Sequence, residues 1–170
     1  MKRKMLLVVA VLLAQGCTYA ISPDLAAQAD KTLPFSRIEA DPALYQGTIV
    51  ILGGTIAKTA LISENTSMIE VQQEQLDTWG KPVSRTPSGG RFLVRSKWFL
   101  NPQVYAPGRE ITVAAVVEGI ARQGIDDTGS SFPVVILREI KLWPREPASW
   151  SRPSYMDPLL YDPYANSPQY

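Results

Sequence analysis

Short apolar segments separated by glycine- and proline-rich stretches fill the middle of this 170-residue chain, and this pattern most constrains its fold. The segments are rich in β-branched residues and follow one another at the spacing of strands joined by hairpins. They cover residues 48–57, 67–76, 91–98, 111–121 and 132–143. No helical periodicity of comparable strength runs through the same region. We therefore predict a mainly β domain of five to six strands.

Internal glycines and one nearly continuous apolar segment favour a barrel over two stacked sheets. Gly53 and Gly54 interrupt the first segment, and glycines inside a strand are typical of a bulge or of a bend at a barrel corner. Residues 111–121 are apolar along almost their whole length, as in a strand on a barrel wall or one buried on both faces. Residues 77–90 and 123–131 have the composition of loops. The fold class that we predict is a small OB-like β-barrel.

The first sixteen residues have the layout of a secretory signal peptide. Three basic residues precede an apolar run over residues 5–14, and small and polar residues then lead to Cys17. Ten residues of helix span about 15 Å, roughly half of the hydrocarbon core of a bilayer. An uncleaved anchor or a core helix is the alternative. We predict that residues 1–16 are removed by cleavage between Gly16 and Cys17.

Cys17 is the sole cysteine of the chain, so no intramolecular disulfide can form. The tetrapeptide at residues 14–17, Ala-Gln-Gly-Cys, resembles the lipobox of bacterial lipoproteins, in which the cysteine thiol receives a diacylglyceryl group. The alternative is a secreted protein with a free thiol. Thr18 stands where an aspartate would be the usual inner-membrane retention signal, so the resemblance implies an outer-membrane address.

The rest of the chain divides into three parts in this interpretation. Residues 17–41 form a lipidated N-terminus and tether, residues 42–143 form the barrel domain, and residues 144–170 form a tail. Asp41 and Pro42 suit the N-cap and first position of a short helix or turn that precedes the barrel. The tail holds six prolines and five aromatic residues and cannot form a core of its own. It wraps onto the barrel, stays extended or is disordered.

Composition removes the usual means of catalysis and of metal binding. The chain has no histidine, the commonest general base and metal ligand, and neither a GxSxG nor a phosphate-binding loop motif. Asp126 and Asp127 are better explained as turn residues than as calcium ligands. We therefore expect no catalytic residues, no metal and no cofactor.

The charge pattern also argues against a nucleic-acid partner. Residues 17–170 carry 14 basic and 16 acidic residues, because three of the 17 basic residues lie in the signal peptide. Basic residues alternate with aromatic ones only around Arg91, Arg95 and Lys97, where charges on the solvent face of a strand are the preferred explanation.

Several short motifs together resemble the Slp family of outer-membrane lipoproteins. They are residues 42–47 (PALYQG), the Gly53-Gly54 pair, residues 76–77 and 81–82, residues 90–92 (GRF), residues 99–102 (FLNP) with Tyr105, and Gly119, Pro133 and Trp143. With the lipobox, the resemblance covers about residues 42–143. It implies a lipid-anchored protein of the outer membrane associated with stress or stationary phase, and it supplies no catalytic residues.

Two kinds of function agree with these observations. The first is a non-catalytic structural or interaction module, most simply facing the periplasm, that contacts envelope proteins or peptidoglycan. The aromatic tail, through Tyr155, Tyr161 and Tyr164, then contributes to docking. The alternative is a small-ligand or glycan-binding lipoprotein with its site near Trp98 and Tyr105. An enzyme acting through carboxylates such as Glu70 or Asp127 is a third, weaker hypothesis.

Overall fold

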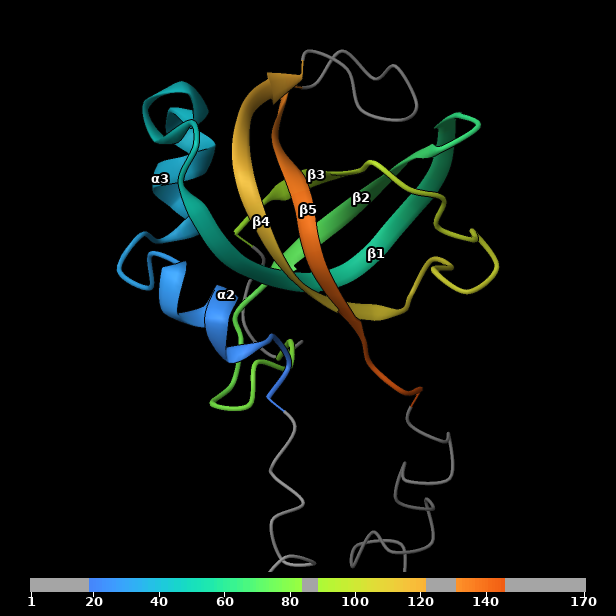
Figure 1. Ribbon diagram of the computed structural model, residues 1–170, viewed down its shortest axis with the longest axis horizontal. Coiled ribbons are helices and arrows are strands. Elements are labelled where there is room, and N and C mark those ends of the chain that lie inside the picture. The colour runs from blue at the N-terminus through green and yellow to red at the C-terminus, as the bar shows by residue number, and fades with distance from the viewer. Residues whose placement is uncertain (1–18, 84–88, 122–130, 146–170) are drawn as a thin grey trace, which may run out of the picture.

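The computed structural model describes residues 19–83, 89–121 and 131–145 (Figure 1). Two short helices and a 3₁₀ turn precede five strands in the described residues. The elements are α2 (Pro23–Gln28), α3 (Phe35–Ala40), η1 (Pro42–Tyr45), β1 (Ile49–Ser63), β2 (Thr66–Glu74), β3 (Arg91–Ser96), β4 (Glu110–Ala121) and β5 (Phe132–Leu142).

The described strands close into a barrel in the order β1-β2-β3-β5-β4, with β4 returning to β1. Neighbouring strands run antiparallel except for β3 and β5, which run parallel. This five-stranded closed barrel confirms the predicted mainly β, OB-like fold. Closure removes the free sheet edges that would otherwise invite strand addition by another chain.

The glycine pair lies where β1 passes from one neighbour to the other. Gly53 and Gly54 pair with both β2 and β4, and a side chain on Gly54 would collide with the backbone of Gln72 in β2. Only a residue without a Cβ allows this close approach. The predicted bulge itself lies slightly further along, where the register between β1 and β2 shifts between Ile56 and Lys58.

Three strand limits differ from the prediction by two residues or more. β1 continues to Ser63 and meets β2 at Thr66, because residues 58–63 pair with β2 although their sequence lacks a clear alternation. β2 ends at Glu74, and Leu76 instead forms an isolated bridge with Pro82. β3 ends at Ser96, two residues before the predicted limit.

Apolar side chains fill the barrel, and two segments close its ends. The inward residues of all five described strands form one core cluster that includes Val50, Val71, Phe92, Val113 and Val135. At one end α3 inserts Phe35 and Ile38, and the rings of Phe35 and Phe92 lie 5.7 Å apart. At the other end the loop between β3 and β4 contributes Leu100 and Tyr105 to the same cluster.

Packing of the N-terminal segment corrects the prediction of a tether over residues 17–41. Ala20 and Ile21 are buried against Ala114 on the outer face of β4. The backbone N–H of Ser22 donates to both carboxylate oxygens of Glu139 in β5, at 3.0 and 3.1 Å. The prediction failed because the apolar residues here are too few and too interrupted by proline to produce a helical period. The folded body therefore begins at residue 20 rather than at residue 42.

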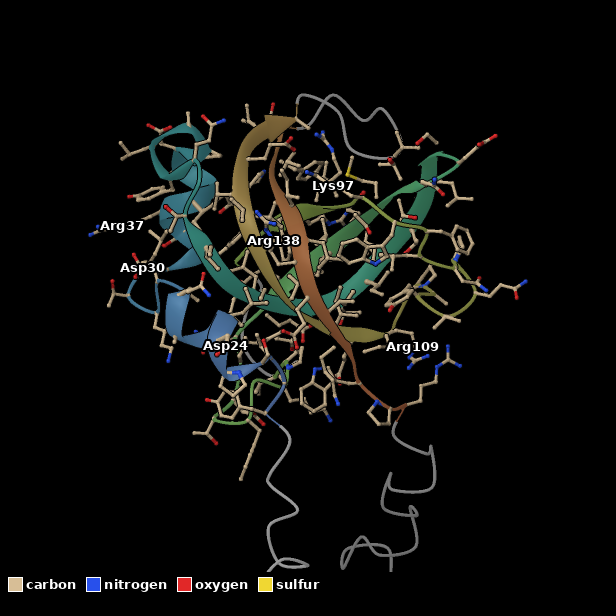
Figure 2. The ribbon with its side chains drawn as sticks, viewed as in Figure 1. Asp24, Asp30, Arg37, Lys97, Arg109 and Arg138 are labelled. Carbon is tan, nitrogen blue, oxygen red and sulfur yellow. The ribbon has the colours of Figure 1, made fainter. Side chains whose placement is uncertain are left out.

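The predicted cap of the short helix is confirmed. Asp41 accepts a hydrogen bond from the backbone N–H of Leu44 at 3.3 Å, and Pro42 occupies the first helical position. Trp143, directly after β5, is held by hydrogen bonds to residues at and just before the start of β4. Its indole Nε1 donates to Thr112 Oγ1 at 3.0 Å. Arg109, which is labelled in Figure 2, donates from Nη2 to the Trp143 carbonyl oxygen at 2.8 Å.

Candidate functional site

Five large apolar side chains lie exposed on two neighbouring segments of the barrel. The segments are the β1–β2 hairpin and the loop that follows β3, and we call this region the distal surface. Its residues are Leu61, Ile62, Trp98, Phe99 and Val104, each between 43% and 58% exposed. Figure 1 shows the hairpin at the upper right of the molecule, on the opposite side from α2 and the blue start of the described chain. Large exposed apolar groups brought together on neighbouring segments are typical of interaction sites.

Hydrogen bonds hold the loop against the hairpin. Thr59 Oγ1 of β1 donates to the carbonyl oxygen of Tyr105 at 2.7 Å. Ser67 Oγ, at the start of β2, accepts from the backbone N–H of Leu100 at 2.9 Å. Because Leu100 and Tyr105 are also anchored in the core, the residues between and before them are presented on a fixed backbone. The distal surface is therefore preorganised, which lowers the entropy cost of binding a partner.

The two aromatic residues predicted for a ligand or partner surface have different environments. Tyr105 is partly buried and packs against the core cluster. Trp98 is exposed, and its backbone is fixed by hydrogen bonds with Ser96 Oγ at 2.8 and 3.2 Å. Sequence reasoning missed Leu61 and Ile62, although two adjacent apolar residues directly before a polar turn were a visible signal.

Charged groups on the outer face of the barrel are paired with one another. Glu70 is almost fully buried, and its Oε1 accepts from Arg91 Nη1 at 2.7 Å. Arg95 Nη1 lies 2.7 Å from Glu118 Oε1. Each of these arginine charges is thus paired with a carboxylate of the barrel itself and is not left free to bind a phosphate group.

Two grooves lie near the segment that links α2 to α3. The larger, about 520 Å³, lies between residues 31–36, the middle of β1 and the end of β2. The smaller, about 370 Å³, continues towards Tyr19 and Gly80. In the larger groove Gln73 Oε1 accepts from the backbone N–H of Gly89 and Glu74 Oε1 accepts from Thr55 Oγ1, so much of its polar lining is already bonded. Trp98 and Tyr105 line neither groove.

Several predicted site residues lie outside the part of the chain that the structure describes. They are Gly16 and Cys17, the acidic pair Asp126 and Asp127, and the tail residues Tyr155, Tyr161 and Tyr164. Their proposed roles stay predictions. Within the described ranges no cluster of three or more cysteine, aspartate or glutamate residues could hold a metal ion. No described helix is long and apolar enough to cross a membrane.

Comparison with known families identifies the chain. The family model of the outer membrane lipoprotein Slp family matches residues 14–170. This chain belongs to the Slp family. As a member of it, the chain is a lipoprotein of the outer membrane and associates with that membrane. The match also includes the tail after Trp143, where the sequence resemblance alone carried nothing over.

Two curated relatives of this Slp-family chain come from Escherichia coli (strain K12). Outer membrane protein Slp is 25% identical over 116 residues, which are 68% of this chain and 61% of that protein. The uncharacterized lipoprotein YeaY is 26% identical over 125 residues, which are 74% of this chain and 64% of that protein. The matched region thus spans less than two thirds of either relative.

Solved structures give weaker matches. Two crystal structures of Rim1, a mitochondrial single-stranded DNA binding protein from S. cerevisiae, are 11% and 10% identical. Each match covers 59% of this chain and 99% of Rim1, with TM-scores of 0.35 and 0.33. Scores this low support no argument about a ligand.

Proposed function

We propose that this outer-membrane lipoprotein is held by acyl chains on Cys17 and acts as a non-catalytic interaction module of the envelope. In this proposal its distal surface binds another envelope protein on the periplasmic side. The observation that carries it is the group of five exposed apolar side chains on two rigidly joined segments. The β1–β2 hairpin lies on the opposite side from the blue start of the described chain, which leaves the hairpin accessible when the N-terminus is at the membrane (Figure 1).

The chemistry of the distal surface favours a protein partner. Its side chains are aliphatic and aromatic, and burying one of them fully is worth about 1.5–3 kcal/mol. Trp98 and Phe99 are adjacent, and aromatic residues dominate the energetically important positions of protein interfaces. A glycan would need several convergent hydrogen-bonding side chains, whereas this surface is defined by apolar ones.

The charged residues support a non-catalytic role. The buried carboxylate of Glu70, weighed as a catalytic group from sequence, is bonded to Arg91. Asp127, the other acidic candidate, lies outside the described residues. The chain also lacks histidine altogether. The Glu70–Arg91 pair and the lack of histidine favour a binding protein over an enzyme that uses general acid–base chemistry.

Site-specific photocrosslinking in the source bacterium tests this function. A photoreactive phenylalanine analogue replaces Ile62 or Trp98 in the full chain, and Leu44, which is exposed on η1, serves as the matched control. We expect crosslinks from both distal positions to one envelope protein identified by mass spectrometry. Phe99→Asp should remove them, because it places a charge in the apolar contact. Equal crosslinking from Leu44, or none from either distal position, contradicts the proposal.

The periplasmic orientation and the link to stress or stationary phase are further parts of the proposal, supported by family resemblance. Protease added to intact cells should leave the chain uncut and should cut it once the outer membrane is permeabilised. Cutting in intact cells contradicts the periplasmic orientation. Chain abundance measured through growth should rise on entry into stationary phase, and constant abundance contradicts the link.

Binding of a small ligand or glycan is the second candidate, favoured by the groove of about 520 Å³. This volume lies within the usual range for small-molecule sites. Peptidoglycan fragments titrated into labelled protein should then shift the NMR signals of Gln73 and Leu76, which line the groove. Shifts at Trp98 and Tyr105 instead would return the ligand to the surface predicted from sequence. Unchanged spectra would remove this candidate.

A further inference from the structure

The link between the folded body and the lipid is short. If Cys17 carries the acyl chains, as in the proposed function, only Thr18 and Tyr19 separate it from Ala20, which is already buried against the barrel. Three residues span at most about 11 Å when fully extended. The surface next to Ala20 is therefore forced to lie close to the bilayer.

That surface carries a tight turn with an exposed tryptophan. Gly80 lies directly against Ala20, since a Cβ added to Gly80 would come within 2.8 Å of the Ala20 Cβ. The turn over residues 77–81 is fixed by Asp77, whose Oδ1 accepts from the backbone N–H groups of both Trp79 and Lys81 at 2.8 Å. The carbonyl oxygen of Lys81 in turn accepts a hydrogen bond from the backbone N–H of Asp77 at 2.8 Å. The backbone that carries Trp79 is therefore held in place.

Trp79 and Tyr19 give this surface the character of a membrane interface. The side chains of Trp79 and Tyr19 are 54% and 55% exposed. Tryptophan and tyrosine are enriched where headgroups meet the hydrocarbon core, because each has an apolar ring and a polar group. Lys81, beside Trp79, lies 3.7 Å from Glu110, so its charge is balanced within the protein. The contact we infer is therefore interfacial rather than purely electrostatic.

We propose that the turn over residues 77–81 rests on the phospholipid surface of the outer membrane, with Trp79 and Tyr19 in the headgroup region. The barrel then has a fixed orientation, and the β1–β2 hairpin points away from the bilayer. This inference rests on the proposed acylation of Cys17. It adds a second, non-covalent membrane contact and a direction to the anchor.

A fluorescent label next to Trp79 tests the contact in the lipidated full chain. Thr78 is exposed and adjacent to Trp79, so Thr78→Cys carries the label while the tryptophan is kept. Ile62→Cys, in the hairpin, is the matched control. Acylated Cys17 does not react with the label, so each variant carries one probe. The proteins are reconstituted into vesicles of phosphatidylethanolamine and phosphatidylglycerol that contain a headgroup nitroxide lipid.

We expect quenching at position 78 to be several-fold stronger than at position 62, with a shift of its emission to shorter wavelength. Adding Trp79→Ala to Thr78→Cys should reduce both effects. Equal quenching at positions 78 and 62 in protein that floats with vesicles and has the mass of the acylated form overturns this inference alone. Unchanged quenching after Trp79→Ala overturns the role of Trp79. Protein that lacks lipid mass and does not float overturns the anchoring proposal together with this inference.

Discussion

Replacing Ile38 by alanine tests whether α3 belongs to the cooperative core. Ile38 is fully buried between α3 and the barrel, in a segment that the sequence had assigned to a tether. The change removes three carbon groups, worth about 0.8 kcal/mol each in transfer free energy. A cavity term adds to this loss, because the surrounding barrel relaxes only in part. We expect the free energy of unfolding to fall by about 3 kcal/mol.

Urea unfolding of residues 18–170, followed by circular dichroism, measures the change. The midpoint should fall while the slope with urea stays constant, because the same surface is exposed on unfolding. Ser36→Ala, at an exposed position of the same helix, is the matched control and should change stability by less than about 0.5 kcal/mol. If the two variants differ by less than about 0.5 kcal/mol, α3 does not stabilise the barrel and the reasoning is refuted.

Three further predictions follow from single contacts. Gly54→Ala places a methyl group against the backbone of β2, which cannot yield. This substitution should therefore lower the unfolding free energy by more than about 2 kcal/mol. A variant with the thermal stability of the wild type would contradict the close approach of β1 to β2 at Gly54. Arg91→Met leaves the carboxylate of Glu70 buried without its partner and should cost about 1–3 kcal/mol, and a double-mutant cycle with Glu70→Gln should recover much of this loss. Hydrogen bonds from the Thr32 side chain, and secondarily from its backbone N–H, lower the pKa of Asp30, so the ionised carboxylate stabilises the folded state. This stabilisation is fully present above the pKa that Asp30 has in the unfolded chain, and it is lost as pH falls through the pKa that Asp30 has in the folded chain. An NMR titration of the Asp30 carboxyl should show the lowered pKa, and Thr32→Val should return it towards 3.8.

The barrel could be predicted from sequence because its strands carry local signals. Residues 111–121 are apolar along their length, and β4 occupies nearly the same range. The glycine pair predicted a bulge or a bend in this strand, and the register between β1 and β2 shifts just beyond the pair, between Ile56 and Lys58. In contrast, the parallel pairing of β3 with β5 depends on residues some forty positions apart, for which one sequence contains no local signal.

The N-terminal helices and the exposed surfaces were harder to predict. α2 and α3 have six residues each, too short for a helical period to be visible, and they are stabilised by tertiary packing of residues such as Phe35. Trp98 was selected from sequence for its residue type. Its grouping with Leu61 and Ile62 depends on how the β3–β4 loop folds back on the hairpin, which composition does not specify.

The bond between Ser22 and Glu139 has a consequence for the order of maturation. It joins residues 117 positions apart, so it cannot form until β5 has been made and exported. Until then, no bond from Ser22 to β5 can hold residues 20–22 against the barrel. Once β5 has been inserted, residues 20–22 pack onto the barrel. In a chain acylated at Cys17, only Thr18 and Tyr19 then separate the lipidated cysteine from the folded domain. Pairing of the last strand therefore decides how closely the folded domain of an acylated chain is held to the membrane.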